Sequence, residues 1–197
     1  PNLNVFKVGK VRTVYDLGEN LLIVASDRIS AFDVILPDGI PEKGKTLTQV
    51  SQFWFDFTKD IVKNHLITID SNDFPEHTKP YHDQLKNRSM FVKKTDLIEV
   101  ECVVRGYLVG SGWKDYQKTQ AVCGIKLPEN LNLASKLENP IFTPAAKARI
   151  GEGHDENIST QEMANRIGQE LTEKLKNISL ELYTKARNHA EKKGIIL

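Results

Sequence analysis

The chain has 197 residues, of which 40% are hydrophobic and 27% charged, as is ordinary for a globular protein. Its 27 basic and 26 acidic side chains leave a net charge of +1, which excludes a broad basic field for non-specific nucleic-acid binding. No apolar run could span a bilayer and no signal-peptide pattern is present, so we expect a cytoplasmic protein without a membrane or nucleic-acid partner.

The length allows one large domain or two lobes that share a core. Cys102 and Cys123 lie among apolar neighbours and outside any Cys-x-x-Cys motif, which predicts reduced, structural thiols rather than a disulfide or a zinc site. The chain begins at Pro1 instead of methionine, so a processed or trimmed N-terminus is expected.

The first third of the sequence reads mainly as strands. Residues 5–17 alternate between apolar and polar, residues 21–26 form a short apolar run, and 18–20 between them suit a hairpin loop. A helix is predicted next, because Thr46 and Gln49 have the spacing of a capping box. Its apolar side chains recur every three or four residues and are interpreted as core: Leu47, Val50, Trp54, Phe57 and Ile61.

Further strands are predicted at 66–70 and 89–105, a short helix at 113–120, and a loop-rich segment at 128–158. A long helix should begin at Ser159, where Ser159 and Glu162 again have capping-box spacing, and stop at Gly194. Its apolar face would consist of Met163, Ile167, Leu171, Leu175, Ile178, Leu182 and Ala186. Residues 195–197 look like the opening of a buried strand, which suggests a chain cut short at its end.

The segment 9–15 carries two cations beside a glycine. Because side chains alternate along a strand, Lys10 and Arg12 should project from one face, an arrangement that suits the polyphosphate of a nucleotide. An ordinary exposed strand face carries the same residues, and neither of the glycine-rich nucleotide motifs is present.

Residues 26–33, Ser-Asp-Arg-Ile-Ser-Ala-Phe-Asp, concentrate polar groups at the end of an apolar strand. Binding groups often gather in such loops. A loop fastened by Asp–Arg and Asx hydrogen bonds explains the pattern equally well, so both interpretations stay open.

Residues 99–113 are the most informative stretch of the sequence. An apolar run leads into Arg105 and then into Gly110-Ser111-Gly112, which we interpret as a turn. Arginine offers a planar fork of donors to phosphate or carboxylate, and a glycine-flanked serine lets backbone N–H groups approach an anion. The alternative is a core strand whose Arg105 pairs with a nearby carboxylate.

Two polar loop segments, 142–147 and 151–157, follow in the second half. The run His154-Asp155-Glu156 lacks the further His or Cys that zinc requires, although a hard cation such as magnesium would accept Asp155 or Glu156. No Ser-His-Asp or Cys-His arrangement can be argued from the spacing alone.

Taken together, these segments resemble the SAICAR synthetase family of purine biosynthesis. The resemblance rests on motifs in the family's order from end to end: 9–15, 26–33, 40–45, 101–114, 141–148 and 154–159. It implies an α+β fold of two lobes, an antiparallel-sheet lobe at 1–94 and an α/β lobe at 95–197, with ATP between them.

The resemblance also implies the reaction. The family joins L-aspartate to the carboxylate of carboxyaminoimidazole ribonucleotide, with ATP hydrolysed to ADP and phosphate under Mg2+. A carboxylate is a poor acylating agent, so ATP would first convert it to an acyl phosphate, which the aspartate amine then attacks.

The ATP-binding residues that the resemblance implies lie in four places. Lys10 and Arg12 would hold the phosphates and act in catalysis, the link at 92–95 would present its backbone to the adenine edge, and Glu101 and Lys147 would face the nucleotide. By residue, the set is Gly9, Lys10, Val11, Arg12, Val92, Lys93, Lys94, Thr95, Glu101 and Lys147.

For the ribonucleotide, the resemblance implies that Arg105 and Ser111 bind the 5′-phosphate and that Asp33 contacts the aminoimidazole. Asp155 would lie by the substrates and take part in catalysis. The segment before it, Gly151-Glu152-Gly153-His154, is one residue longer than the family's Gly-Glu-His-Asp pattern.

The family continues after its long helix with Asp-x-Lys-x-Glu-Phe-Gly and later acids that coordinate magnesium, so the metal ligands are expected beyond Leu197. Without them the chain should bind nucleotide weakly or turn over poorly. Two other functions remain as alternatives, an ATP-dependent kinase that does not need aspartate and a nucleotide-binding fragment without catalysis. The sequence does not determine the oligomeric state.

Overall fold

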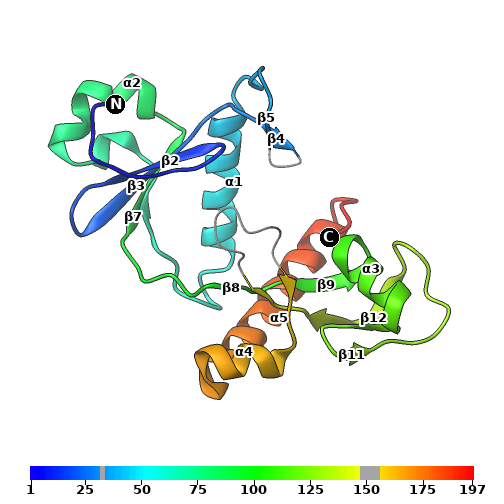
Figure 1. The fold of residues 1–197 in the computed structure, drawn as a ribbon. Helices are drawn as coiled ribbons and strands as arrows, with labels where there is room; N and C mark the ends of the chain where they lie inside the picture. The colour runs from blue at the N-terminus through cyan, green and yellow to red at the C-terminus, as the bar shows by residue number, and fades with distance from the viewer. Residues whose placement is uncertain (32–33, 147–155) are drawn as a thin grey trace. The chain divides into compact units, whose positions relative to one another are not determined.

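The computed structural model describes residues 1–31, 34–146 and 156–197. The chain divides into two compact units, residues 1–96 and 97–197, each with its own helices, strands and apolar core (Figure 1). Every strand pair in the described part is antiparallel. The predicted α+β class is confirmed.

Unit 1 is built on a five-stranded sheet with the order β1-β2-β3-β7-β6. A two-stranded ribbon, β4 with β5, stands apart from it. The strands are β1 (Val5–Val8), β2 (Arg12–Asp16), β3 (Asn20–Ala25), β4 (Ser30–Ala31), β5 (Val34–Ile35), β6 (Leu66–Thr68) and β7 (Ser89–Lys93). The predicted hairpin is confirmed between β2 and β3, where Gly18 has φ +89° and donates its N–H to Asp16.

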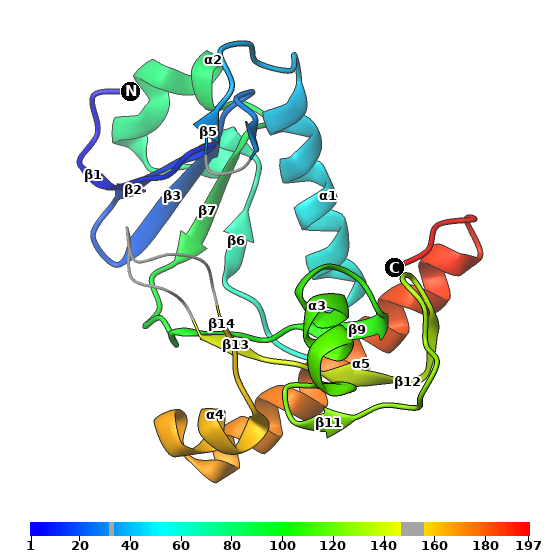
Figure 2. The ribbon, with the colours of Figure 1, turned by 45° about the vertical axis from the view of Figure 1, so that its right-hand side comes forward.

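The two faces of this sheet are covered by different elements. Tyr15, Leu22 and Phe91 are neighbours in register and form a core with residues from the helical layer of η1 (Ser71–Asp73), η2 (Glu76–Tyr81) and α2 (His82–Leu85). Ala25, of opposite parity, faces α1 (Lys43–Phe57), which lies along the other face (Figure 2). Because side chains alternate along β3, this strand contributes residues to the packing on both faces of the sheet.

The start of α1 differs from the prediction. The helix begins at Lys43, before the expected capping box at Thr46, and its N-cap Glu42 makes no side-chain cap. Asp27, in the loop after β3, takes that role because its Oδ1 accepts a hydrogen bond from the Gly44 N–H at 2.9 Å. The predicted core face is wrong in part, since Leu47 and Val50 are 46% and 45% exposed.

In unit 2, residues 97–146 and 156–197 form three small sheets, ordered β12-β9, β14-β13-β8 and β10-β11. Their strands are β8 (Val100–Glu101), β9 (Val104–Tyr107), β10 (Ala121–Val122), β11 (Ile125–Lys126), β12 (Lys136–Phe142), β13 (Ala145–Ala146) and β14 (Glu156–Asn157). The seven-residue β12 corrects the loop-rich prediction for 128–158. Its partner β9 supplies the hydrogen-bonding groups that hold it, and these cannot be seen in the local sequence.

The helices in the described part of unit 2 are α3 (Gly110–Thr119), α4 (Thr160–Ile167) and α5 (Gln169–Glu191). The predicted cap is confirmed, because Ser159 Oγ accepts from the Glu162 N–H at 3.1 Å. The predicted single long helix is wrong, since it breaks at Gly168, where φ is +88°. The stop at Gly194 is confirmed by its φ of +75° and by the bond from Ile195 N–H to the Ala190 carbonyl. Residues 195–197 form no strand.

Candidate functional site

Arg105 is the centre of the polar cluster in unit 2. It lies on β9, and both ends of its guanidinium fork are engaged. Nη1 donates to the carbonyl and the hydroxyl of buried Thr143, while Nη2 donates to Ser111 Oγ at 2.8 Å and to Asn157 Oδ1 at 3.4 Å. The guanidinium plane is therefore fixed before any ligand arrives.

The prediction of a loop-like turn at Gly110-Ser111-Gly112 is wrong, because these residues form the first helical turn of α3. The N-cap Val109 is extended and provides no side-chain cap within the described part, so this turn's leading backbone N–H groups have no capping side chain. Gly112 is required for packing, because a Cβ there would lie 2.9 Å from Arg105 Nε. The helix start, the Ser111 hydroxyl and Arg105 thus gather donors at one place.

Burial and neighbouring charges act in opposite directions on the charge of Arg105. Burial lowers the pKa of Arg105, and Cys123 and Asp115 oppose that shift. Burial also raises the pKa of the Cys123 thiol to about 11, so at neutral pH the thiol is uncharged and does not stabilise the positive charge of Arg105. Asp115 is therefore the anion that stabilises the guanidinium at neutral pH.

Unit 2 contains features of both interpretations of residues 99–113, the anion site and the pairing of Arg105 with a carboxylate. Arg105 and Ser111 are brought together, as the resemblance implies for a phosphate site. Arg105 also meets a carboxylate, but indirectly, through Asn157, whose Nδ2 donates to Asp115 Oδ2 at 2.6 Å. Thr143 and Asn157 were missed as site residues because no spacing rule relates positions 38 and 52 residues away to Arg105. Asp115 was missed because it joins the cluster only through Asn157, which is 42 residues away from it.

In unit 1, Lys10 lies in the turn between β1 and β2 rather than on a strand, so the argument that it shares a strand face with Arg12 is wrong. The turn is closed by the Gly9 N–H, which donates to the Arg12 carbonyl at 2.7 Å. Ser26 Oγ and Arg28 Nη2 donate to the carbonyls of Val11 and Gly9 at 2.9 and 3.4 Å, which fastens the turn to the loop after β3.

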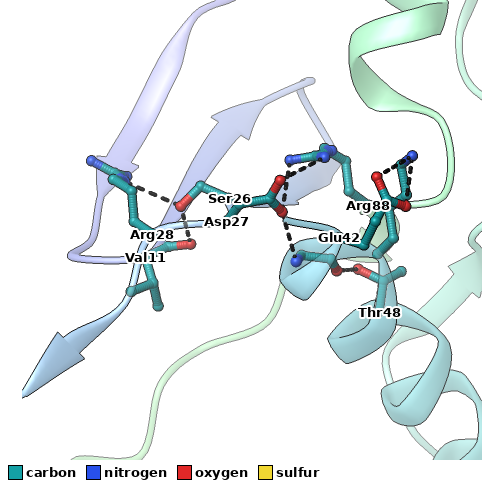
Figure 3. A network of polar contacts seen from close by, with 9 residues as sticks. Val11, Ser26, Asp27, Arg28, Glu42, Thr48 and Arg88 are labelled. Atoms are coloured by element: carbon teal, nitrogen blue, oxygen red, sulfur yellow. Dashed lines mark hydrogen bonds and ion pairs between the residues drawn. The ribbon is translucent and has the colours of Figure 1, made fainter. Parts of the chain in front are cut away.

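That loop is organised by Asp27, as Figure 3 shows. Its two carboxylate oxygens accept from the two terminal nitrogens of Arg88, each at 3.3 Å, and Oδ1 also caps α1. The predicted Asp–Arg fastening of this loop is present, with the distant Arg88 as Asp27's partner. Beside it lies a pocket of about 320 Å³, lined by Val11, Arg12, Ala25, Leu47, Thr48, Ser51 and Met90.

The remaining predicted residues lie as follows. Val92 is buried in β7, Lys93 ends that strand, and Lys94 pairs with Asp16 at 2.8 Å, while Thr95 is exposed. Glu101 ends β8 in unit 2.

Three predicted site residues, Asp33, Lys147 and Asp155, lie outside the described residues. Within the described ranges, no group of three or more His, Cys, Asp or Glu side chains could hold a metal ion. The described helices also include none that is long and apolar enough to cross a membrane.

This α+β fold has solved counterparts among the SAICAR synthases. The SAICAR synthase from Saccharomyces cerevisiae complexed with SAICAR aligns with a TM-score of 0.89 and 40% identity, over 99% of this chain and 66% of that chain. A type-2 SAICAR synthetase in complex with ADP has the same fold, with a TM-score of 0.74 and 24% identity over 98% and 71% of the two chains.

Residues 5–197 match the family model described as SAICAR synthetase, and the chain belongs to this family. A relative from Desulfosudis oleivorans named phosphoribosylaminoimidazole-succinocarboxamide synthase is 57% identical over 100% of this chain and 67% of its own. Its namesake from Citrifermentans bemidjiense is 56% identical over 100% and 66%. The chain spans about two thirds of the length of these relatives.

Proposed function

We propose that this chain belongs to an ATP-dependent ligase that joins L-aspartate to the carboxylate of carboxyaminoimidazole ribonucleotide, forming SAICAR, ADP and phosphate. The observation that carries the proposal is the Arg105–Ser111 pair at the start of α3, where the N-cap Val109 offers no capping side chain, in a chain whose relatives are named for this reaction. The ligands are small molecules, and the reaction belongs in the cytoplasm.

The unit 2 cluster would hold the 5′-phosphate of the ribonucleotide. A phosphate oxygen can accept from Arg105 Nη2 and from the Ser111 hydroxyl, and the backbone N–H groups at the start of α3 favour the same charge. Because Thr143 already orients the guanidinium, little conformational entropy is lost when the phosphate binds.

Unit 1 would bind ATP. Lys10 lies within the Gly9–Arg12 turn and Arg12 ends it, and their charges would neutralise the phosphates during transfer. The backbone of residues 92–95 would meet the adenine edge, and Glu101 would face the nucleotide. Asp33 for the aminoimidazole, Lys147 for ATP and Asp155 for the substrates complete the proposed set.

The chemistry follows from the weak reactivity of a carboxylate. Its oxygen attacks the γ-phosphorus of ATP, ADP leaves, and an acyl phosphate forms. The aspartate amine then attacks the acyl carbon, phosphate leaves with the former carboxylate oxygen, and the nitrogen loses a proton. Aligned binding supplies the proximity term, and no covalent enzyme nucleophile is needed.

Mg2+ is proposed as the metal cofactor. The described residues do not fit a metal site, since no suitable group of ligands occurs among them, and none of them is assigned as a ligand. As the family resemblance implies, we propose that these ligands follow Leu197.

The test follows ADP release by the complete gene product, with each substrate omitted in turn. We expect sustained, multiple-turnover release only when ATP, carboxyaminoimidazole ribonucleotide and L-aspartate are all present. Release that is indifferent to aspartate would favour the kinase alternative instead. Nucleotide binding without any turnover would favour the non-catalytic one.

A further inference from the structure

Asn157 occupies the middle of a chain of contacts that ends at the proposed phosphate site. It ends β14, whose partner β13 begins two residues after Thr143, the residue that holds the other side of the Arg105 fork. Its Nδ2 donates to Asp115 Oδ2 at 2.6 Å, and its Oδ1 accepts from Arg105 Nη2 and Ser111 Oγ at 3.4 and 3.5 Å. One amide thus links α3, β9 and β14.

The Asp115 contact fixes which way this amide points. A carboxylate only accepts hydrogen bonds, so the Asn157 NH2 group must face Asp115 and the carbonyl oxygen must face Arg105 and Ser111. The reversed amide would place oxygen against oxygen at Asp115 and donors against Arg105. Both ends of the amide therefore enforce the same orientation.

The lengths of the contacts show how the oxygen can act. The bond to Asp115 is short, whereas the two contacts of Oδ1 lie at the limit for hydrogen bonds. Oδ1 therefore holds the guanidinium and the hydroxyl proton weakly, and a phosphate oxygen could replace it as their acceptor. Binding would exchange two weak contacts for charge-assisted ones.

We propose that Asn157, oriented by Asp115, is a positioning residue of the anion site, which pre-sets the donors of Arg105 and Ser111 for a phosphate group. This inference rests on the phosphate role in the proposed function. Asn157 acts through the two donors and is not itself a contact of the reacting atoms. A neutral oxygen suits this place, because a charged one would compete with the ligand for Arg105.

The test uses ribose 5-phosphate, with ribose as the uncharged control, in calorimetric titrations of the 197-residue chain. The variants are Asn157→Asp, Asp115→Asn and the double variant that exchanges the two residue types. Asn157→Asp removes the donor to Asp115 and places a negative charge beside Arg105. The exchange restores a donor–acceptor pair with its polarity reversed, and Asn165→Asp, on the exposed face of α4, controls for the added charge.

We expect Asn157→Asp to weaken ribose 5-phosphate binding at least about tenfold, roughly 1.4 kcal/mol, and Asn165→Asp to leave it unchanged. In the double variant, the urea midpoint of unfolding should return toward that of the original chain, but affinity should stay low. Recovery of both the urea midpoint and the affinity in the double variant would mean that the pair is only structural and would overturn the inference. Normal affinity in Asn157→Asp would also overturn it.

The same titrations separate this inference from the proposed function. Failure of the original chain to prefer ribose 5-phosphate over ribose would overturn the phosphate site and this inference with it. Normal binding by the original chain with unaffected variants would overturn the inference alone.

Discussion

Arg105 keeps its charge where burial opposes it, and its side chain is fixed by Thr143, Ser111 and Asn157. Such an arrangement stabilises a ligand anion without reorganisation at the moment of binding. The same residue also closes a structural network, so its two roles must be separated by measurement.

Arg105→Ala in the complete gene product should raise the KM for the ribonucleotide and leave the KM for ATP unchanged. Charge-assisted hydrogen bonds contribute roughly 1.5–3 kcal/mol, so kcat/KM for the ribonucleotide should fall about 10- to 150-fold. Steady-state kinetics with each substrate varied, alongside Arg166→Ala on α4 as the control, provide the measurement. A folded variant with an unaltered ribonucleotide KM would show that Arg105 is structural.

In unit 1, Asp27 is the charged residue at the centre of a polar network, as Arg105 is in unit 2. The Gly44 N–H lowers the pKa of this carboxyl, burial opposes the shift, and Arg88 lowers the pKa further. The folded state therefore binds the proton less readily than the unfolded state, so Asp27 stabilises the fold above the ordinary carboxyl pKa. This contribution is lost as the pH falls through the lowered value.

Asp27→Asn should reduce the free energy of unfolding by roughly 1–3 kcal/mol at pH 7, with a difference that shrinks below about pH 4. Urea unfolding of the 197-residue chain from pH 7 to pH 3 checks both statements. Asp38→Asn is the control, since the exposed Asp38 forms no ion pair with another described residue. A difference that stays constant with pH would show that the charge of Asp27 is not the cause.

Residue patterns in the sequence indicated part of this site. The donor chemistry of Arg105 and Ser111 was apparent from their types and proximity in sequence. The pairing of Asp27 with Arg88, 61 residues away, and of Asn157 with Asp115, 42 residues away, depends on tertiary contacts that no local rule encodes.

At the scale of elements, the seating of α1 on the sheet depends on Gly44. A Cβ at this position would lie 2.6 Å from the Ala25 carbonyl oxygen, a backbone atom of β3 that cannot move without shifting the strand. The helix start, its Asp27 cap and the pocket beside it all depend on this close approach.

Gly44→Ala therefore sets two effects of opposite sign against each other. Helix propensity alone would stabilise the chain by roughly 0.5–1 kcal/mol, whereas forced overpacking should destabilise it by about 1–3 kcal/mol. We expect destabilisation in urea unfolding, while Thr46→Ala, at an exposed position of the same helix, should change stability little. A more stable Gly44→Ala chain would refute the close-packing argument.

Elements with strong local signals were predicted well. The β2–β3 hairpin, the Ser159 cap and the Gly194 stop each follow from one residue type in its preferred conformation. Elements that depend on contacts with distant parts of the chain were predicted poorly. Examples are β12, which pairs with β9, and the start of α1, which Asp27 caps. The break at Gly168 was overlooked because the apolar periodicity continues across it.

At the scale of the whole molecule, the α+β class and the family follow from motifs spread from end to end, because together they are far more specific than any one alone. The chain covers about two thirds of its curated relatives, and its described part offers donors for phosphate but no group of metal ligands. Activity therefore has to be measured on the complete gene product.

The most direct test of the account follows an oxygen atom. Carboxyaminoimidazole ribonucleotide labelled with ¹⁸O in its carboxylate is incubated with the complete gene product, ATP and L-aspartate, and the released phosphate is analysed by mass spectrometry. Because the acyl phosphate carries a carboxylate oxygen, each phosphate should contain one ¹⁸O, and none should form without aspartate. Unlabelled phosphate, or repeated turnover of ATP to ADP and phosphate without aspartate, would contradict ligation through an activated carboxylate.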